Sequence, residues 1–315
     1  TDGAGLVLIG ANDKRVLKAK NMLEQPAFLS DVEDARAFSI RQGRGVRLPK
    51  RPTIAYRPGW EVAYDEWDMR VGKAILWAAD RAPRLNLALA PKGSHLPREA
   101  LPGTAATLSW KGALAAATAE VTLRRQDGTV IPLPQHSLGH PEGAVALEIP
   151  IVQAGAYVID VIAREGKRVA SFGSIALTVI SQRNVENVAL DPDWAEIGEP
   201  LSGEITLSGN PGTNERLVVG LLDRRDREIA RQTVSVAADK ATFTFTAQPW
   251  FPMLLEVRAT LVDGTGDVSS AWAFAHVVKR HHGQFNFIMW DVPRGNLAPV
   301  AEESLARTGV TVHLG

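Results

Sequence analysis

Apolar and polar residues alternate with a period of two through most of the chain between residues 84 and 279. The alternation is clear at 119–124, 145–149 and 157–163, and turn residues such as Asp127 and Gly128 separate the runs. Because successive side chains of a strand point to opposite faces of a sheet, these runs predict strands with one buried face. Short strands at regular spacing with Gly and Pro turns are typical of an antiparallel β-sandwich.

The same plan occurs twice. Alternating runs at 204–207, 241–245 and 254–261 follow the first set, and each half has about 95 residues, the size of an immunoglobulin-like sandwich. We therefore expect β-sandwich 1 at 84–181 and β-sandwich 2 at 182–279.

The two ends of the chain follow another pattern. At the N-terminal end, a glycine-bounded apolar run at 6–9 predicts a buried strand, and apolar residues spaced by three or four predict a helix over 64–80. Strand and helix in alternation favour an α/β domain, so residues 1–83 are expected to be the last part of one.

Residues 280–315 predict a βαβ piece. Strand-like runs at 285–290 and 310–314 flank an amphipathic helix over 298–308. Trp290, Asp291 and His313 lie at the carboxyl ends of these strands, the edge where α/β barrels build their active sites. They are candidate substrate contacts.

Composition narrows the class of function. Lys and Arg number 35, as do Asp and Glu, so the formal net charge is zero, which argues against nucleic-acid binding. No apolar run reaches the roughly 18–20 residues of a membrane-spanning helix. The chain has no cysteine, which removes disulfides, thiolate metal sites and a cysteine nucleophile.

Three motifs in the N-terminal part carry a resemblance. GAGLVLIG at 3–10 resembles the "GGGLVLIG" strand of class I glutamine-amidotransferase-like, flavodoxin-like domains. GRGVRL at 43–48 resembles their "GKGRVV" hairpin, and KAILWAADR at 73–81 resembles the terminal "ALLWAAGR" helix of such domains in large bacterial glycosidases. The resemblance covers about 80 residues, and non-catalytic versions of such domains resemble the sheet domain that supports the active site in trimeric β-galactosidases of the family 42 type. GVTV at 309–312 resembles the start of strand two of a glycosidase (β/α)8 barrel.

The resemblance implies an accessory or scaffolding fragment of a bacterial multidomain glycoside hydrolase. Its catalytic carboxylates would follow Gly315, and the amidotransferase cysteine is missing, so no catalytic residue is assigned here. The chain opens at Thr1 without Met and ends after a strand-like run, which fits a piece of a larger protein, with a processed N-terminus as the alternative. The remainder of the parent chain and carbohydrate would be its partners, a homo-oligomer is left open, and a periplasmic or extracellular location is favoured.

Two other functions remain open. The alternative is a non-catalytic carbohydrate-binding or adhesion protein built of immunoglobulin-like modules, and the third reading is a degenerate amidotransferase-like regulatory protein. Trp60, beside Arg57, Tyr64 and Trp67, is a further sugar-contact candidate, because aromatic and cationic groups together suit sugar stacking. The competing interpretation places Trp67 and Trp77 in the core and has Trp60 cover a loop.

No metal or cofactor site is expected. His136 and His140 are four residues apart but flank a glycine rather than lying on a helix, where metal pairs of this spacing occur. Asp191, Asp193 and Glu196 form an acidic loop without the pattern of an EF-hand.

Overall fold

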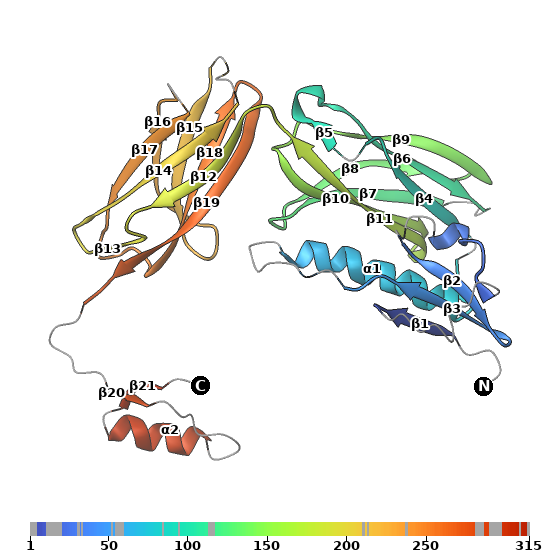
Figure 1. The fold of residues 1–315 in the computed structure, drawn as a ribbon, viewed down its shortest axis with the longest axis horizontal. Helices are drawn as coiled ribbons and strands as arrows, with labels where there is room; N and C mark the ends of the chain where they lie inside the picture. Colours follow the sequence, from blue (N-terminus) through green and yellow to red (C-terminus); the bar gives the residue numbers. More distant parts are fainter. Residues whose placement is uncertain are drawn as a thin grey trace.

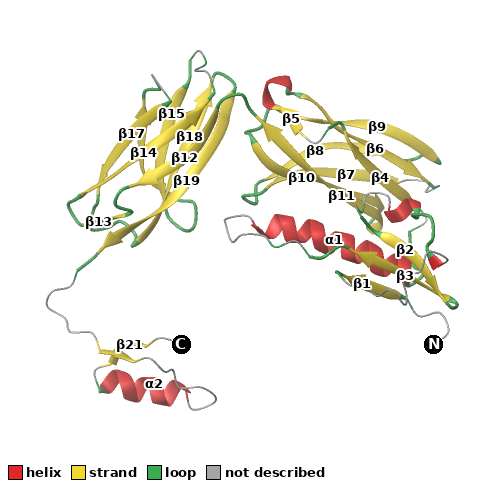
Figure 2. Ribbon diagram, in the orientation of Figure 1, coloured by secondary structure: helices red, strands yellow, loops and turns green. Residues whose placement is uncertain are grey.

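The fold of the chain comes from a computed structural model (Figures 1 and 2). It describes residues 5–10, 21–29, 32, 34–51, 53, 60–83, 85–93, 95–112, 117–209, 212, 214–236, 239–280, 287–289, 298–308 and 310–313. Strands hold most of these residues, and two α-helices occur among them. The described part of the chain is therefore mostly β.

Sandwich 1 consists of a three-stranded and a five-stranded sheet packed face to face. The small sheet has the order β4-β6-β9 and the large one β5-β11-β10-β7-β8. The strands are β4 (Asn86–Pro91), β5 (His95–Pro97), β6 (Gly103–Lys111), β7 (Ala117–Arg125), β8 (Val130–Ser137), β9 (Glu142–Ile149), β10 (Gly155–Glu165) and β11 (Arg168–Ile180). Leu87, Leu108, Leu123, Leu147 and Ile159 are buried in the core between the two sheets.

Sandwich 2 follows after a short linker and is built the same way. Its sheets have the orders β12-β14-β17 and β13-β19-β18-β15-β16. The strands are β12 (Asn184–Leu190), β13 (Trp194–Glu196), β14 (Pro200–Ser208), β15 (Arg216–Leu222), β16 (Glu228–Val234), β17 (Lys240–Thr246), β18 (Leu254–Asp263) and β19 (Gly266–Val278). In β17 every second residue is buried, so the alternation of KATFTFT gives the strand and its inward face directly.

The two sandwiches share one topology. In each, the first, third and sixth strands form the small sheet, and the second, eighth, seventh, fourth and fifth form the large one. In each, the short second strand pairs parallel with the last strand, as β5 does with β11 and β13 with β19. All other strand pairs of the two sandwiches are antiparallel. This arrangement is of the immunoglobulin-like type that the period-two pattern predicts.

The N-terminal part is a small mixed sheet with one helix. Its elements are β1 (Leu6–Ile9), the 3-10 turn η2 (Ala27–Leu29), β2 (Arg36–Ile40), β3 (Gly43–Leu48) and α1 (Trp60–Ala78). β3 pairs parallel with β1 and antiparallel with β2. Trp67 and Trp77 are buried in the core below α1, so the packing interpretation of Trp67 is confirmed.

The helix α1 lies between this small sheet and the large sheet of sandwich 1 (Figure 1). Lys73 of α1 is fully buried, and its ammonium lies 5.2 Å from the ring centre of Phe28 and 5.9 Å from that of Phe172 on β11. Arg124 of β7 bonds Asp160 of β10 and, at 2.8 Å, Asp65 of α1. The helix therefore covers the outer face of sandwich 1.

The expectation of a flavodoxin-like α/β piece at 1–83 is wrong. A flavodoxin-like sheet is parallel and carries helices on both faces. Here the described sheet has one parallel pair, and its single helix is shared with the neighbouring β-sandwich. The sequence could not show this, because an amphipathic helix has the same spacing whichever sheet it covers.

At the C-terminal end, β20 (Phe287–Met289) pairs parallel with β21 (Val310–His313), and α2 (Ala298–Arg307) lies between them in the chain. Among the described residues, no helix is long and apolar enough to span a membrane.

Candidate functional site

Several polar side-chain contacts join the two sandwiches at their junction. Arg98 opens the 3-10 turn η3 (Arg98–Ala100) of sandwich 1, and its side chain is only 5% exposed. It reaches the β18–β19 turn of sandwich 2, where Nη1 donates to Asp263 Oδ2 at 2.9 Å and Nη2 to Thr265 Oγ1 at 2.9 Å. Its Nε donates to the Asp267 carbonyl at 3.1 Å. We call this set of contacts the Arg98 clasp.

The next residue, Glu99, forms hydrogen bonds to the linker between the two sandwiches, residues 181–183. Its Oε1 accepts hydrogen bonds from the Ser181 hydroxyl at 2.8 Å and from the Gln182 backbone N–H at 3.1 Å. Burial acts to raise the pKa of Glu99, but these hydrogen bonds and the Arg98 charge outweigh it, so the pKa lies below its ordinary value. The ionised carboxylate is therefore the form that fixes the linker.

Asp263 behaves in the same way on the other side of the clasp. Burial acts to raise its pKa, but hydrogen bonds from Thr265 and Arg98 outweigh this and lower it. Two further bonds cross the junction: the Ala154 N–H donates to the Val268 carbonyl at 2.8 Å, and Arg125 Nη2 donates to Ser270 Oγ at 3.4 Å. The two sandwiches are thus joined by contacts well beyond the linker itself.

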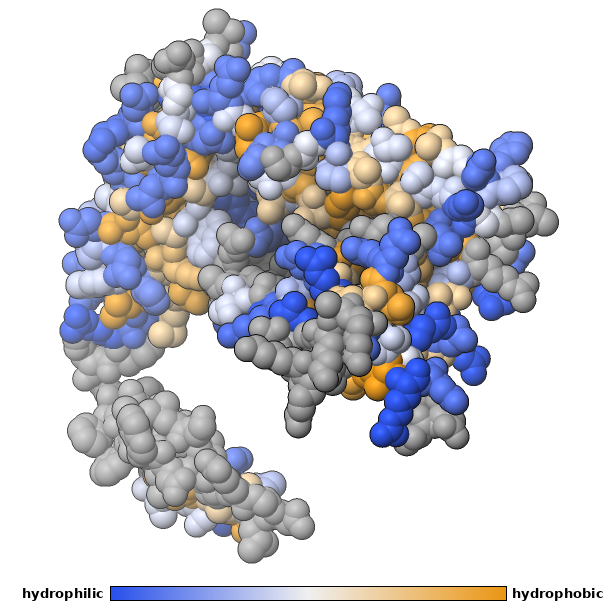
Figure 3. Space-filling model, turned by 45° about the vertical axis from the view of Figure 1, so that its right-hand side comes forward, coloured by the Kyte–Doolittle hydropathy of each residue, from blue (hydrophilic) through white to orange (hydrophobic). Residues whose placement is uncertain are grey.

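A polar cleft of about 300 Å³ opens beside these contacts, and we call it the junction cleft. Sandwich 1 contributes the β7–β8 turn and the segment before β10, and sandwich 2 contributes the outer face of β18 and β19. Figure 3 shows the molecule hollowed between the two sandwiches, with hydrophilic residues around the hollow. The volume is at the lower end of the range for small-molecule sites.

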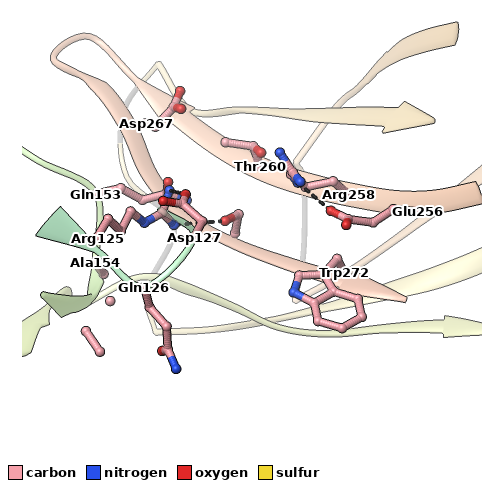
Figure 4. A pocket seen from close by; sticks show the side chains of 13 residues that line it. Arg125, Gln126, Asp127, Gln153, Ala154, Glu256, Arg258, Thr260, Asp267 and Trp272 are labelled. Carbon is pink, nitrogen blue, oxygen red and sulfur yellow. Dashed lines mark hydrogen bonds and ion pairs between the residues drawn. The ribbon is translucent and has the colours of Figure 1, made fainter. Parts of the chain in front are cut away.

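The charged side chains of the junction cleft are arranged in pairs. Arg125 Nη1 lies 2.9 Å from Asp127 Oδ2 on one wall, and Arg258 Nε lies 2.6 Å from Glu256 Oε1 on the other (Figure 4). Burial acts to lower the pKa of Arg258, but Glu256 and Asp226 outweigh it and raise the pKa. With Asp267 included, two cations face three carboxylates, so the lining is close to neutral.

An aromatic strip leads out of the cleft along β19. Trp272 is 37% exposed and lines the cleft beside the Glu256–Arg258 pair (Figure 4). Its ring centre lies 4.9 Å from that of Phe274, which is 41% exposed on the same face. Trp194 of β13 is also 41% exposed, and its register partner is His276 on β19.

One buried donor of the cleft has no partner. Gln153 is 8% exposed, and its Nε2 makes no hydrogen bond. In Figure 4 its side chain extends toward Arg125 and Asp127. Its backbone carbonyl accepts from the Tyr157 hydroxyl at 2.7 Å, and burial raises the pKa of Tyr157 to about 12, so that phenol is a neutral donor. The main chain at Gln153 is therefore fixed, while the buried Nε2 of its side chain lacks a hydrogen-bond partner.

This arrangement offers hydrogen-bond donors, acceptors and an indole face, which suit the binding of a polar uncharged ligand. Within the described ranges, no three His, Asp or Glu side chains are grouped as a metal site would require.

The candidates from the sequence lie elsewhere. Trp60 is the first residue of α1 and His313 the last of β21, but their side chains fall outside the described part of the structure. Trp290 and Asp291 lie outside the described residues altogether.

Sequence reasoning missed Arg98, Gln153 and Trp272. For Trp272 a signal existed: Trp272, Phe274 and His276 alternate with three alanines, so the large residues of β19 point away from the core. Arg98 and Gln153 lie in short connecting segments that carry no pattern.

Comparisons with known proteins find distant likenesses. No family model matches the chain, and no curated protein matches it. A tetra-tandem repeat from the extending region of a large adhesion protein is similar at 17% identity over 62% of this chain and 50% of that chain, with a TM-score of 0.26. Red sea bream transglutaminase is similar at 11% identity over 66% and 34%, with a TM-score of 0.29. The native form of E. coli alpha-2-macroglobulin is similar at 12% identity over 67% and 18%, also with a TM-score of 0.29.

The chain spans half or less of each of these three, and TM-scores this low establish no shared function. The resemblance to a glycoside hydrolase with a glutamine-amidotransferase-like domain is wrong: the comparisons give it no support, and the N-terminal sheet lacks the architecture it implies. The three motifs describe a strand, a hairpin and a helix, which many folds share. The structure instead establishes two β-sandwiches of the immunoglobulin-like type that meet at a polar junction.

Proposed function

We propose that the chain is a non-catalytic binding or adhesion region, in which two immunoglobulin-like sandwiches are held at a fixed angle and carbohydrate is the ligand. The observation that carries this proposal is the Arg98 clasp. A buried guanidinium that forms hydrogen bonds to the neighbouring domain restricts the relative motion of the two domains. Such a contact is expected in a rigid unit with one continuous surface and not in a chain of flexibly linked modules.

The energetics support a rigid junction. A charge-assisted hydrogen bond contributes about 1.5–3 kcal/mol, and a buried cation left without its partners is costly. Opening the junction would leave Arg98 and Asp263 without each other and would also break the Ala154–Val268 backbone bond. The closed arrangement is therefore favoured over a hinge.

Carbohydrate is favoured by the exposed aromatic strip of β19, since sugar rings stack on indole and phenyl faces that lie beside polar groups. Trp272 and Phe274 supply such faces next to Glu256 and Arg258.

The test uses the absence of cysteine in the chain. Gln135 on sandwich 1 and Thr242 on sandwich 2 are exposed, so Gln135→Cys and Thr242→Cys provide sites for a pair of spin labels. Because the chain has no native cysteine, only these two positions would be labelled. We expect pulsed electron spin resonance to give one narrow distance distribution, whereas a broad distribution would contradict the rigid unit. Incubation with aryl glycosides should release no phenol, and hydrolysis that depends on an acidic residue of this chain would contradict the non-catalytic role.

A further inference from the structure

We infer that the junction cleft binds a neutral hexose, alone or as a unit of an oligosaccharide, with Trp272 stacking on the sugar ring and Gln153 donating to a hydroxyl. This inference rests on the proposed carbohydrate-binding function and gives it a site and a ligand class.

Charge pairing selects a neutral ligand. Arg125 and Arg258 already have carboxylate partners at 2.9 Å and 2.6 Å, so an anionic ligand would compete with Asp127 and Glu256 for them. A sugar hydroxyl both donates and accepts, so it can bond the free lone pairs of the carboxylates without separating either pair. Asp267 adds a third carboxylate to the lining and disfavours anions further.

The indole supplies the apolar half of the contact. Trp272 faces the cleft from the outer side of β19, directly across from Arg258 in the strand register. One face of a hexopyranose carries mainly C–H groups, and such a face packs on an aromatic ring while the equatorial hydroxyls reach the polar groups around it. Arg258 and Glu256 are placed to receive those hydroxyls.

Gln153 supplies the second, independent sign of a ligand. A buried donor without a partner destabilises the folded state, and such groups are uncommon in folded proteins. Gln153 is one of the residues that line the cleft, and its Nε2 is such a donor, enclosed by the protein atoms around it. Rotation of this amide toward the cleft would let a ligand hydroxyl accept from Nε2 and satisfy the donor.

Both sandwiches form the walls, so the Arg98 clasp acts on the site from outside. Arg98 does not line the cleft, but it fixes the distance between the Gln153 wall and the Trp272 wall. Preorganised walls bind more tightly because the ligand need not order them. Arg98→Ala should therefore weaken sugar binding without removing any contact to the sugar.

The experiment measures binding of lactose, cellobiose, maltose and a digalacturonate to the full chain by calorimetry. We expect at least one neutral disaccharide to bind and the digalacturonate to bind more weakly. Trp272→Ala should lower the affinity on the order of tenfold, since it removes the aromatic face on which the sugar ring stacks. Trp250→Ala is the matched control: Trp250 is 64% exposed and does not line the cleft, so its loss should leave the affinity unchanged.

A second variant guards against effects on folding. Gln153→Met keeps the volume of the side chain and removes the amide donor, and it should weaken binding several-fold without lowering the melting temperature. No binding of any neutral disaccharide would overturn the inference, as would tighter binding of the digalacturonate or equal loss in the Trp250 and Trp272 variants. If the sugars fail to bind while the spin-label distance stays narrow, the site is wrong and the rigid two-sandwich unit stands; a broad distance distribution contradicts the unit itself.

Discussion

Replacing Arg98 by Ala should release the two sandwiches from each other without unfolding either. The side chain is 5% exposed and bonds Asp263, Thr265 and the Asp267 carbonyl of the other sandwich. Neither hydrophobic core contains it, so each sandwich keeps its own packing. The stabilising contacts that Arg98→Ala removes are therefore those between the two sandwiches.

The magnitude follows from the contacts. A charge-assisted bond contributes about 1.5–3 kcal/mol, and removing one partner of a fully buried ion pair costs about 3–5 kcal/mol. The Asp263 side chain is 25% exposed, so water replaces part of the lost interaction. We expect about 2–3 kcal/mol in favour of the open junction, a roughly 30- to 150-fold change in the ratio of closed to open.

The assay is the spin-label distance between positions 135 and 242, with scattering of the unlabelled chain beside it. The Arg98→Ala distribution should broaden and the radius of gyration should rise. Arg98→Lys should give an intermediate result, because the ammonium keeps the charge but loses the planar fork. Arg231→Ala is the control: Arg231 is paired with Glu228 at 2.8 Å within sandwich 2, and its removal should change neither quantity.

A narrow distance distribution for Arg98→Ala, equal to that of the unchanged chain and with both sandwiches folded, would contradict the role given to the Arg98 clasp. In that case the Ala154–Val268 hydrogen bond and the linker would be sufficient to fix the relative position of the two sandwiches without the Arg98 clasp.

Three further predictions concern pH, the core and a glycine with a positive φ angle. The pKa values of Glu99 and Asp263 are lowered in the closed junction, so both carboxylates stabilise it fully above their ordinary pKa values of 4.5 and 3.8. This stabilisation is lost as the pH falls through the lowered pKa values. The distance distribution should therefore stay narrow from neutral pH down to about 5 and broaden below about 4. Phe243→Ala, at a core position 2% exposed, should destabilise sandwich 2 by about 3–5 kcal/mol in chemical denaturation and leave sandwich 1 unchanged, whereas Thr242→Ala on the exposed face of the same strand should cost well under 1 kcal/mol. Gly209 has φ +80° and an added Cβ would overlap the Gln182 carbonyl, so Gly209→Ala should lower the melting temperature by several degrees; Gly264→Ala, where a Cβ meets open space, should not.

The pattern of side chains on single strands was enough to predict the two sandwiches. In β17 the alternation of Ala241, Phe243 and Phe245 with threonines matches the buried and exposed positions of the structure. Such a strand has one face in the core and one in water, and this contrast is written into the sequence at a spacing of two.

The spacing of side chains gave the wrong exposure where the helix α1 covers the outer face of the large sheet of sandwich 1. In β10, Val158 and Asp160 are buried although they point away from the sandwich core, because α1 lies over them. Asp160 is 7% exposed and bonded to Ser174 and Arg124, so its polarity there reflects a paired buried group rather than a solvent-facing position. The sequence shows only a polar residue in a strand, and it does not distinguish a buried, paired residue from one that faces solvent.

By itself, the sequence determined that the middle of the chain forms short strands with one inward face, as in immunoglobulin-like sandwiches, since these features depend on the spacing of neighbouring side chains. The tertiary structure decided that α1 covers a β-sandwich rather than completing an α/β domain, that Arg98 meets Asp263 across 165 residues, and that Gln153 and Trp272 line one cleft. Contacts between distant segments depend on how whole elements pack, and no local spacing of residues specifies which surfaces meet.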